Sequence, residues 1–139
     1  MWVAWGLCVA GLCLGAYLGA RGLLDPGWAA KLVRLKQDEQ GGGFAEFRAT
    51  YGGVFLGLHA AALLLVFVYL RGGAPLPGVA ATGAVFVVAA AWAGAALGRV
   101  VSIWRDTGAD TRFNRLSAAV EGGIALCVGA PWALWLIGG

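Results

Sequence analysis

The sequence predicts an all-α fold, a transmembrane four-helix bundle that forms one integral membrane domain over residues 1–139. Hydrophobic residues make up 60% of the chain and charged residues 12%, whereas ordinary soluble domains have about 45–50% and about 25%. Four apolar runs each reach the roughly 20 residues that a helix needs to cross hydrocarbon. They cover about 2–24, 45–70, 78–104 and 113–137. No segment remains that is long enough for a soluble domain.

The first run lacks a preceding basic region and is longer than the roughly 7–15 apolar residues of a signal peptide, so we expect it to stay in the mature protein. It contains Gly11-x-x-x-Gly15-x-x-x-Gly19, which places a ridge of glycines on one helical face. Such a ridge lets another helix approach closely in lipid. The approaching helix belongs either to the same chain or to a second copy.

A short amphipathic helix is expected between the first two spans, where it would lie in the membrane interface. Asp25 suits an N-cap and Pro26 suits the first helical position. The segment combines an apolar stripe and a basic face, made of Trp28, Leu32 and Leu35 and of Lys31, Arg34 and Lys36. A polar, glycine-rich turn at residues 37–43 then leads to the second span.

Basic residues gather around the first and third connections between the spans. They are Arg21, Lys31, Arg34, Lys36 and Arg48 around the first, and Arg99, Arg105, Arg112 and Arg115 around the third. Only Arg71 lies at the second connection. Because loops rich in Lys and Arg stay in the cytoplasm, we expect both termini to lie outside the cell.

The second run opens with polar side chains. If residues 45–70 form one α-helix, the step of about 100° per residue places Arg48, Tyr51 and His59 on one face, with Glu46 elsewhere. A charged residue at the centre of a span costs about 2.5–3.5 kcal/mol on insertion scales, so such residues face the bundle interior and find partners. We therefore expect the chain to supply an acid for Arg48.

The third and fourth runs carry further polar groups in the same half of the membrane. Gly94-x-x-x-Gly98 directly precedes Arg99, and Ser102 shares the face of Arg99. In the fourth run, polar residues at i, i+3 and i+7 share one face, namely Asn114, Ser117 and Glu121. Glu121 is the acid that this arrangement offers to a buried arginine.

We predict that these side chains form one polar cluster on the cytoplasmic side, in which either Arg48 or Arg99 pairs with Glu121. The candidate binding residues are Glu46, Arg48, Tyr51, His59, Arg99, Ser102, Asn114 and Glu121. The alternative is purely structural, because buried polar side chains also fasten helices together in lipid, at about 0.6–2 kcal/mol per hydrogen bond. Both interpretations stay open at this point.

The chain also shows signs of an internal repeat, with two halves of two spans each. Short matching sequences recur at nearly constant offsets: Leu18-Gly19 and Leu97-Gly98, Asp25-Pro26-Gly27 and Asp106-Thr107-Gly108, and Arg34-Leu35 and Arg115-Leu116. Two such units in the same orientation would be related by an axis along the membrane normal. Chance agreement in a glycine-rich chain is the alternative.

Several kinds of chemistry lack the residues that they need. A lone His59 does not supply a zinc or a haem site, and the three cysteines show no metal-binding or redox spacing. No catalytic set of residues is apparent, and nothing in the sequence indicates nucleic-acid binding. We expect no catalytic residues, no metal and no cofactor.

The motif Glu46-Phe47-Arg48-Ala49-Thr50-Tyr51-Gly52-Gly53, followed by Gly98-Arg99 with Ser102 and then by Glu121, resembles that of an uncharacterised family of small bacterial four-helix membrane proteins. The resemblance implies the same fold, a bacterial inner membrane location and importance of these positions, but no activity. In architecture the chain is also similar to the DoxX-like proteins, some of which are implied to accompany quinone-linked enzymes. Architecture does not fix function.

These observations favour a small non-enzymatic membrane protein that acts as an accessory or scaffold subunit, or that binds a lipid-like molecule. Its expected partners are membrane lipids, a membrane protein or a second copy in a homo-oligomer, and a hydrophobic small molecule. The alternative is a transporter or enzyme that handles a quinone, a sterol-like molecule or an isoprenoid at the polar cluster.

Overall fold

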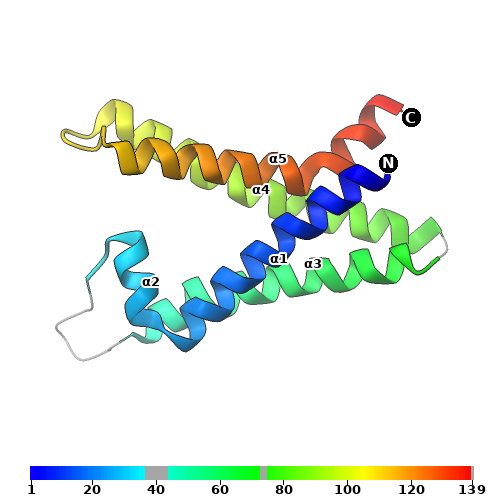
Figure 1. The fold of residues 1–139 in the computed structure, drawn as a ribbon, viewed down its shortest axis with the longest axis horizontal. Helices are drawn as coiled ribbons and strands as arrows, with labels where there is room; N and C mark the ends of the chain where they lie inside the picture. Colours follow the sequence, from blue (N-terminus) through cyan, green and yellow to red (C-terminus); the bar gives the residue numbers. More distant parts are fainter. Residues whose placement is uncertain (37–43, 73–74, 139) are drawn as a thin grey trace. The chain divides into compact units, whose positions relative to one another are not determined.

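The computed structural model describes residues 1–36, 44–72 and 75–138, and this part of the chain is almost entirely helical. Six helical elements follow one another, namely α1 (Trp2–Leu24), α2 (Pro26–Val33), the π-helix η1 (Phe47–Val54), α3 (Phe55–Leu70), α4 (Pro75–Arg105) and α5 (Arg112–Gly138) (Figure 1). The predicted all-α class is confirmed. The predicted polar turn at residues 37–43 lies outside the described residues.

Within the described part of the chain, four segments are long and apolar enough to cross a membrane, and the chain is therefore a multi-pass membrane protein. They are Trp2–Leu24, Phe47–Leu70, Gly78–Arg105 and Arg112–Ile137. These spans agree with the predicted runs to within a few residues. The α4 helix begins at Pro75, three residues before the predicted third run, because proline fits the first turn of a helix, where its missing N–H is not needed.

The chain forms two compact units. One consists of Leu12–Leu64, and the other of Met1–Gly11 together with Leu65–Gly139. The predicted internal repeat stays a prediction. Locally the two halves differ, because η1 opens the second span with π-helical turns, whereas α5 is α-helical from its start at Arg112.

In the unit formed by Leu12–Leu64, the glycines of α1 allow the backbone of the second span to come close. A Cβ atom at Gly19 would lie 2.8 Å from the Cα of Leu56, and one at Gly22 would lie 2.5 Å from the carbonyl oxygen of Tyr51. No side chain fits at either position without moving backbone atoms. The α1 ridge therefore packs within the chain, which decides between the two partners that the sequence left open.

The short helix α2 belongs to the same unit and is capped as predicted. The Asp25 carboxylate accepts a hydrogen bond from the backbone N–H of Trp28 at 3.0 Å, and Arg34 ends the helix in the left-handed conformation at φ 59°. Ala29 and Ala30 are buried against Phe47. This contact fixes α2 on the start of the second span.

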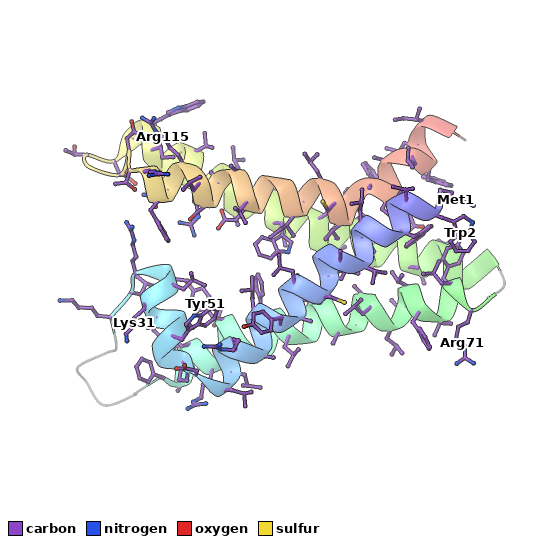
Figure 2. All side chains as sticks on the ribbon, viewed as in Figure 1. Met1, Trp2, Lys31, Tyr51, Arg71 and Arg115 are labelled. Atoms are coloured by element: carbon purple, nitrogen blue, oxygen red, sulfur yellow. The ribbon has the colours of Figure 1, made fainter. Side chains whose placement is uncertain are left out.

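The predicted apolar stripe of α2 is divided in the structure. Trp28 packs on the cluster of Ala29, Ala30 and Phe47, and the guanidinium of Arg21 lies 4.8 Å from its ring centroid. Leu32 and Leu35 are exposed, and Leu35 follows the left-handed turn at Arg34 and so leaves the helical register. Lys31 projects outward from α2 (Figure 2).

In the other unit, α4 and α5 lie side by side along their length (Figure 1). Val85 on α4 and Val128 on α5 are fully buried. The first turns of α1 complete this unit, because Gly11 lies so close to α5 that a Cβ atom there would be 2.7 Å from Cγ2 of Val128. The ring of Trp5 also packs at a tilt against that of Tyr69 at the end of α3, with the centroids 5.1 Å apart.

Candidate functional site

The sequence motif that begins at Glu46 forms the π-helix η1. Phe47–Val54 make i→i+5 hydrogen bonds in place of the α-helical i→i+4 bonds. Gly52 has its backbone against α1, since a Cβ atom at this position would lie 2.6 Å from the Cα of Leu23. π-helical turns are frequent at functional sites in other proteins, so this segment is a candidate for a functional role.

The assumption that residues 45–70 form a single α-helix is wrong, because the segment opens with the π-helix η1. A π-helix has a wider turn than an α-helix, so each residue rotates the chain by less than the assumed 100°. Positions 48 and 51 are therefore displaced around the axis relative to His59. In accord with this, Arg48 and Tyr51 are exposed whereas His59 is buried.

Arg48 binds the end of the preceding span. Its Nη1 donates a hydrogen bond to the backbone carbonyl oxygen of Leu23, which belongs to the last turn of α1. Carbonyls in that turn have no partner within the helix, and a positive charge there also interacts favourably with the helix dipole. The partner found for Arg48 is thus a carbonyl and not the carboxylate that the sequence suggested.

The two other candidate residues of the motif, Glu46 and Tyr51, are exposed. Glu46 occupies the N-cap position of η1, but its side chain makes no capping hydrogen bond. Tyr51, labelled in Figure 2, is 37% exposed. Its ring stacks on that of Phe47, with the centroids 5.4 Å apart. Phe47 in turn meets Phe44 edge to face at 5.9 Å.

His59 is buried, with 2% of its surface exposed. Its Nδ1 lies 2.7 Å from the carbonyl oxygen of Phe55, and because a carbonyl can only accept, Nδ1 carries the proton in this contact. The opposite edge of the ring lies against Gly15 of α1, where a Cβ atom would overlap Nε2. The contacts of His59 therefore hold the second span against α1.

The remaining predicted residues lie in the other unit. Arg99 of α4 and Glu121 of α5 form an ion pair between the two helices, in which Nε of Arg99 lies 2.7 Å from Oε1 and 2.9 Å from Oε2. The Glu121 side chain is 12% exposed and that of Arg99 is 30% exposed. Of the two arginines that the sequence offered to Glu121, the structure pairs it with Arg99.

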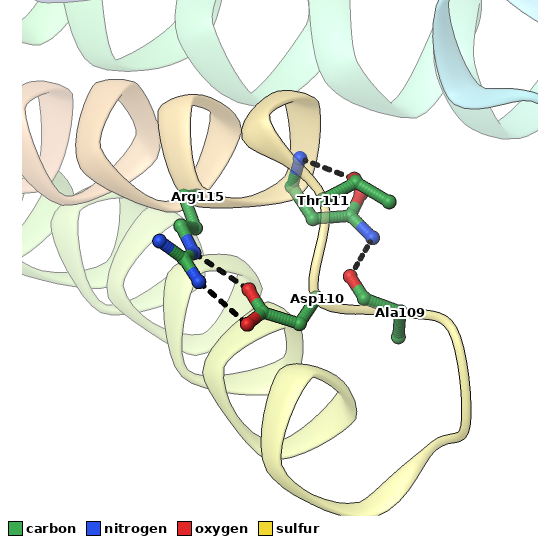
Figure 3. A network of polar contacts seen from close by, with 5 residues as sticks. Ala109, Asp110, Thr111 and Arg115 are labelled. Carbon is green, nitrogen blue, oxygen red and sulfur yellow. Dashed lines mark hydrogen bonds and ion pairs between the residues drawn. The ribbon is translucent and has the colours of Figure 1, made fainter.

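Ser102 and Asn114 take part in contacts at the turn between α4 and α5. The hydroxyl of Ser102 donates to the Asp106 carboxylate at 2.5 Å. Asn114 donates from Nδ2 to the carbonyl oxygen of Ala109 at 2.8 Å, and its backbone N–H donates to Oγ1 of Thr111 at 3.2 Å (Figure 3). Thr111 is thus the N-cap of α5, a position at which Thr is one of the preferred residues.

The ion pair of this turn was not predicted from the sequence. Arg115 donates to Asp110 from Nε at 2.6 Å and from Nη2 at 2.5 Å (Figure 3). These hydrogen bonds hold the pKa of the Asp110 carboxyl below its ordinary value. The spacing of five residues across a helix start gave no usable signal, because the i, i+3 and i, i+4 rules for charge pairs apply within helices.

The candidate residues thus form two groups, with Glu46, Arg48, Tyr51 and His59 in one unit and Arg99, Ser102, Asn114 and Glu121 in the other. The single cluster that the sequence analysis proposed stays a prediction. Among the described residues, no three His, Cys, Asp or Glu side chains come together in a way that could hold a metal ion.

Comparison of the chain with protein-family models, with curated proteins and with solved structures finds no match. The resemblance to the bacterial four-helix family stays a prediction.

Proposed function

We propose that this protein is a non-enzymatic accessory or scaffold subunit of a bacterial inner membrane, and that it packs against a helix of another membrane protein or of a second copy. The docking surface is a glycine face of α4, which consists of Gly83, Gly94 and Gly98. At about 100° per residue these three positions fall within about 60° of one another. Small residues at such spacing are typical of close helix contacts in lipid.

The observation that carries this proposal is the contrast between two sets of glycines. On α1, a Cβ atom at Gly11 or Gly19 would overlap atoms of this chain, so that ridge is already occupied. On α4, a Cβ atom at Gly83, Gly94 or Gly98 would meet no atom of the described residues within 4 Å. Glycine weakens a helix by about 1 kcal/mol relative to alanine, and nothing within the described chain requires it at these positions.

Substitution of one glycine tests the proposal. The variant Gly94→Leu fills the face, and Ala93→Leu adds the same side chain to the neighbouring exposed position about 100° around the same helix. Protein is extracted gently from its native membrane and its assemblies are weighed by native mass spectrometry. We expect a stoichiometric partner or a defined homo-oligomer for the unmodified chain and for Ala93→Leu, and its loss for Gly94→Leu.

Thermal unfolding of the isolated chain is the control for folding. Gly94→Leu should be at least as stable as the unmodified chain, because a Cβ atom at Gly94 has no described atom within 4 Å and leucine is a better helix former than glycine. An unmodified chain that is always a lone monomer would overturn the proposal, as would a Gly94→Leu variant that keeps its partner.

The orientation belongs to the same proposal, with the α4–α5 turn in the cytoplasm and both termini outside. The four arginines between Arg99 and Arg115 support it. Reporter fusions after residue 108 and at the C-terminus, one active only in the cytoplasm and one only outside, test this orientation. The transporter or enzyme alternative stays a prediction.

A further inference from the structure

The ion pair between α4 and α5 leaves much of the Arg99 guanidinium unused. Arginine has five N–H donors, and in this pair the Nε alone contacts both oxygens of Glu121. A fork-shaped pairing would also use a terminal nitrogen. No described residue accepts a hydrogen bond from either terminal nitrogen of Arg99, and the side chain is 30% exposed whereas that of Glu121 is 12% exposed.

Three of the four neighbours of Arg99 on its own helix are small. Ala95 and Ala96 lie one turn before it and Ser102 one turn after it, and only the fourth neighbour, Ile103, is bulky. The Ser102 hydroxyl is bonded to Asp106 and so is directed toward the end of the helix. At about 1.5 Å per residue, Arg99 is about 9 Å from Arg105 at the end of α4, a depth from which arginine reaches the lipid headgroups.

The positive and negative charges at this end of the α4–α5 pair are also unbalanced. Between residues 99 and 121 the chain carries four arginines and three carboxylates, which are Arg99, Arg105, Arg112 and Arg115 and Asp106, Asp110 and Glu121. Two ion pairs use two of these arginines and two of these carboxylates. One positive charge in excess remains at this end of the α4–α5 pair, on Arg105 and Arg112 against Asp106. It attracts anionic headgroups to this end of the pair but does not itself fix where a phosphate binds.

We propose that the terminal nitrogens of Arg99 bind the phosphate of an anionic phospholipid. Glu121 positions the guanidinium by holding Nε, so that the two terminal amino groups present their donors together. Arginine is the residue that matches phosphate oxygens with two parallel hydrogen bonds, and a donor without an acceptor is costly in hydrocarbon. This site does not depend on the glycine face of α4, so either proposal can fail alone.

The test uses the full chain in detergent, titrated with phosphatidylglycerol and followed by native mass spectrometry. The variant with both Arg99→Gln and Glu121→Gln removes the guanidinium without changing the net charge. The matched control Arg105→Gln lowers the net charge by one but leaves the ion pair intact. We expect the first phosphatidylglycerol to bind about tenfold more weakly to the double variant, and within about twofold of the unmodified affinity to Arg105→Gln.

Two further probes separate the sources of the phosphate. Diacylglycerol with the same acyl chains lacks the phosphate, and glycerophosphoglycerol is the free headgroup; neither should compete with phosphatidylglycerol. Equal retention of diacylglycerol would show an apolar contact, and equal binding of glycerophosphoglycerol would show a soluble ligand. Either result overturns the lipid assignment, as does equal weakening by Arg105→Gln, which would indicate non-specific attraction.

The double variant could lose its fold, and a second variant keeps the proposal testable in that case. Arg99→Lys retains the charge and one contact to Glu121 but not the planar donor pair. We expect it to fold and to bind phosphatidylglycerol several-fold more weakly than the unmodified chain. Unchanged affinity in Arg99→Lys would overturn the role of the guanidinium.

Discussion

The contact between Gly15 and His59 gives the sharpest prediction about stability. In a Gly15→Ala variant the added methyl group would lie 2.7 Å from Cε1 of His59 and closer still to Nε2 and Cδ2. The ring cannot simply move away, because it is buried and its Nδ1 is bonded to the carbonyl oxygen of Phe55. Either α1 and the second span separate locally or this hydrogen bond is lost.

The expected loss of stability in Gly15→Ala combines three contributions. Overpacking a filled contact costs about 1–3 kcal/mol, and a lost hydrogen bond costs about 1 kcal/mol more. The better helix propensity of alanine offsets this by up to about 1 kcal/mol. We therefore expect Gly15→Ala to lower the free energy of unfolding by about 2–3 kcal/mol, measured in mixed micelles with an increasing fraction of a denaturing detergent.

Two comparisons show whether the overlap is the cause. Gly6 lies on the same helix, and a methyl group added there would have no described atom within 4 Å, so Gly6→Ala should be neutral or stabilising by up to about 1 kcal/mol. In a His59→Ala background, Gly15→Ala should cost less than about 0.5 kcal/mol, which corresponds to a coupling of about 2 kcal/mol. If the cost is the same with and without the imidazole, the reasoning is wrong.

Three further predictions concern the charged groups. Glu121→Gln should destabilise the chain by about 1–4 kcal/mol, between the values for exposed and buried ion pairs, and adding Arg99→Gln should restore most of the loss in the same unfolding assay. Arg48→Gln should cost about 1–2 kcal/mol, because it removes a charged donor from the last turn of α1; no change would mean that the contact does not persist in solution. The pKa of Asp110 is lowered by its hydrogen bonds to Arg115, so the carboxylate stabilises the fold above the ordinary aspartate pKa, and this contribution is lost as the pH falls through the lowered value. Carbon NMR of the Asp110 carboxyl should show the low pKa, and Arg115→Gln should return it to the ordinary range.

Much of the fold follows from composition alone, because a span must be apolar over about 20 residues and few other sequences allow that. The residues that start and cap helices could be predicted equally well. Asp25 is the N-cap of α2 and Pro26 is its first residue, the positions that these residue types favour. Thr111 is the N-cap of α5. These features depend on neighbouring residues only, so the sequence contains what is needed to predict them.

The parts of the candidate site that the sequence did not predict depend on contacts between distant residues. The acceptor for Arg48 is a backbone carbonyl, and any residue at position 23 would provide one. Trp28 turns inward because Ala29 and Ala30 pack on Phe47, which periodicity within α2 does not reveal. The π-helix is a third example, because Gly52 within it lies against the backbone of α1, a contact between distant residues that the periodicity of the sequence does not reveal.

The direction of the Arg48 side chain depends on how many residues the π-helix contains. A π-helical segment holds more residues per turn than an α-helix does, so removing one residue between Phe47 and Val54 would let the segment close into α-helical hydrogen bonds. The chain before the deletion would then turn relative to α3 by the difference between the π-helical and α-helical windings, which would change the distance from Arg48 to the carbonyl of Leu23. A one-residue gap in this segment would thus mark a relative in which the end of the first span is held differently, even if every side chain of the motif were kept.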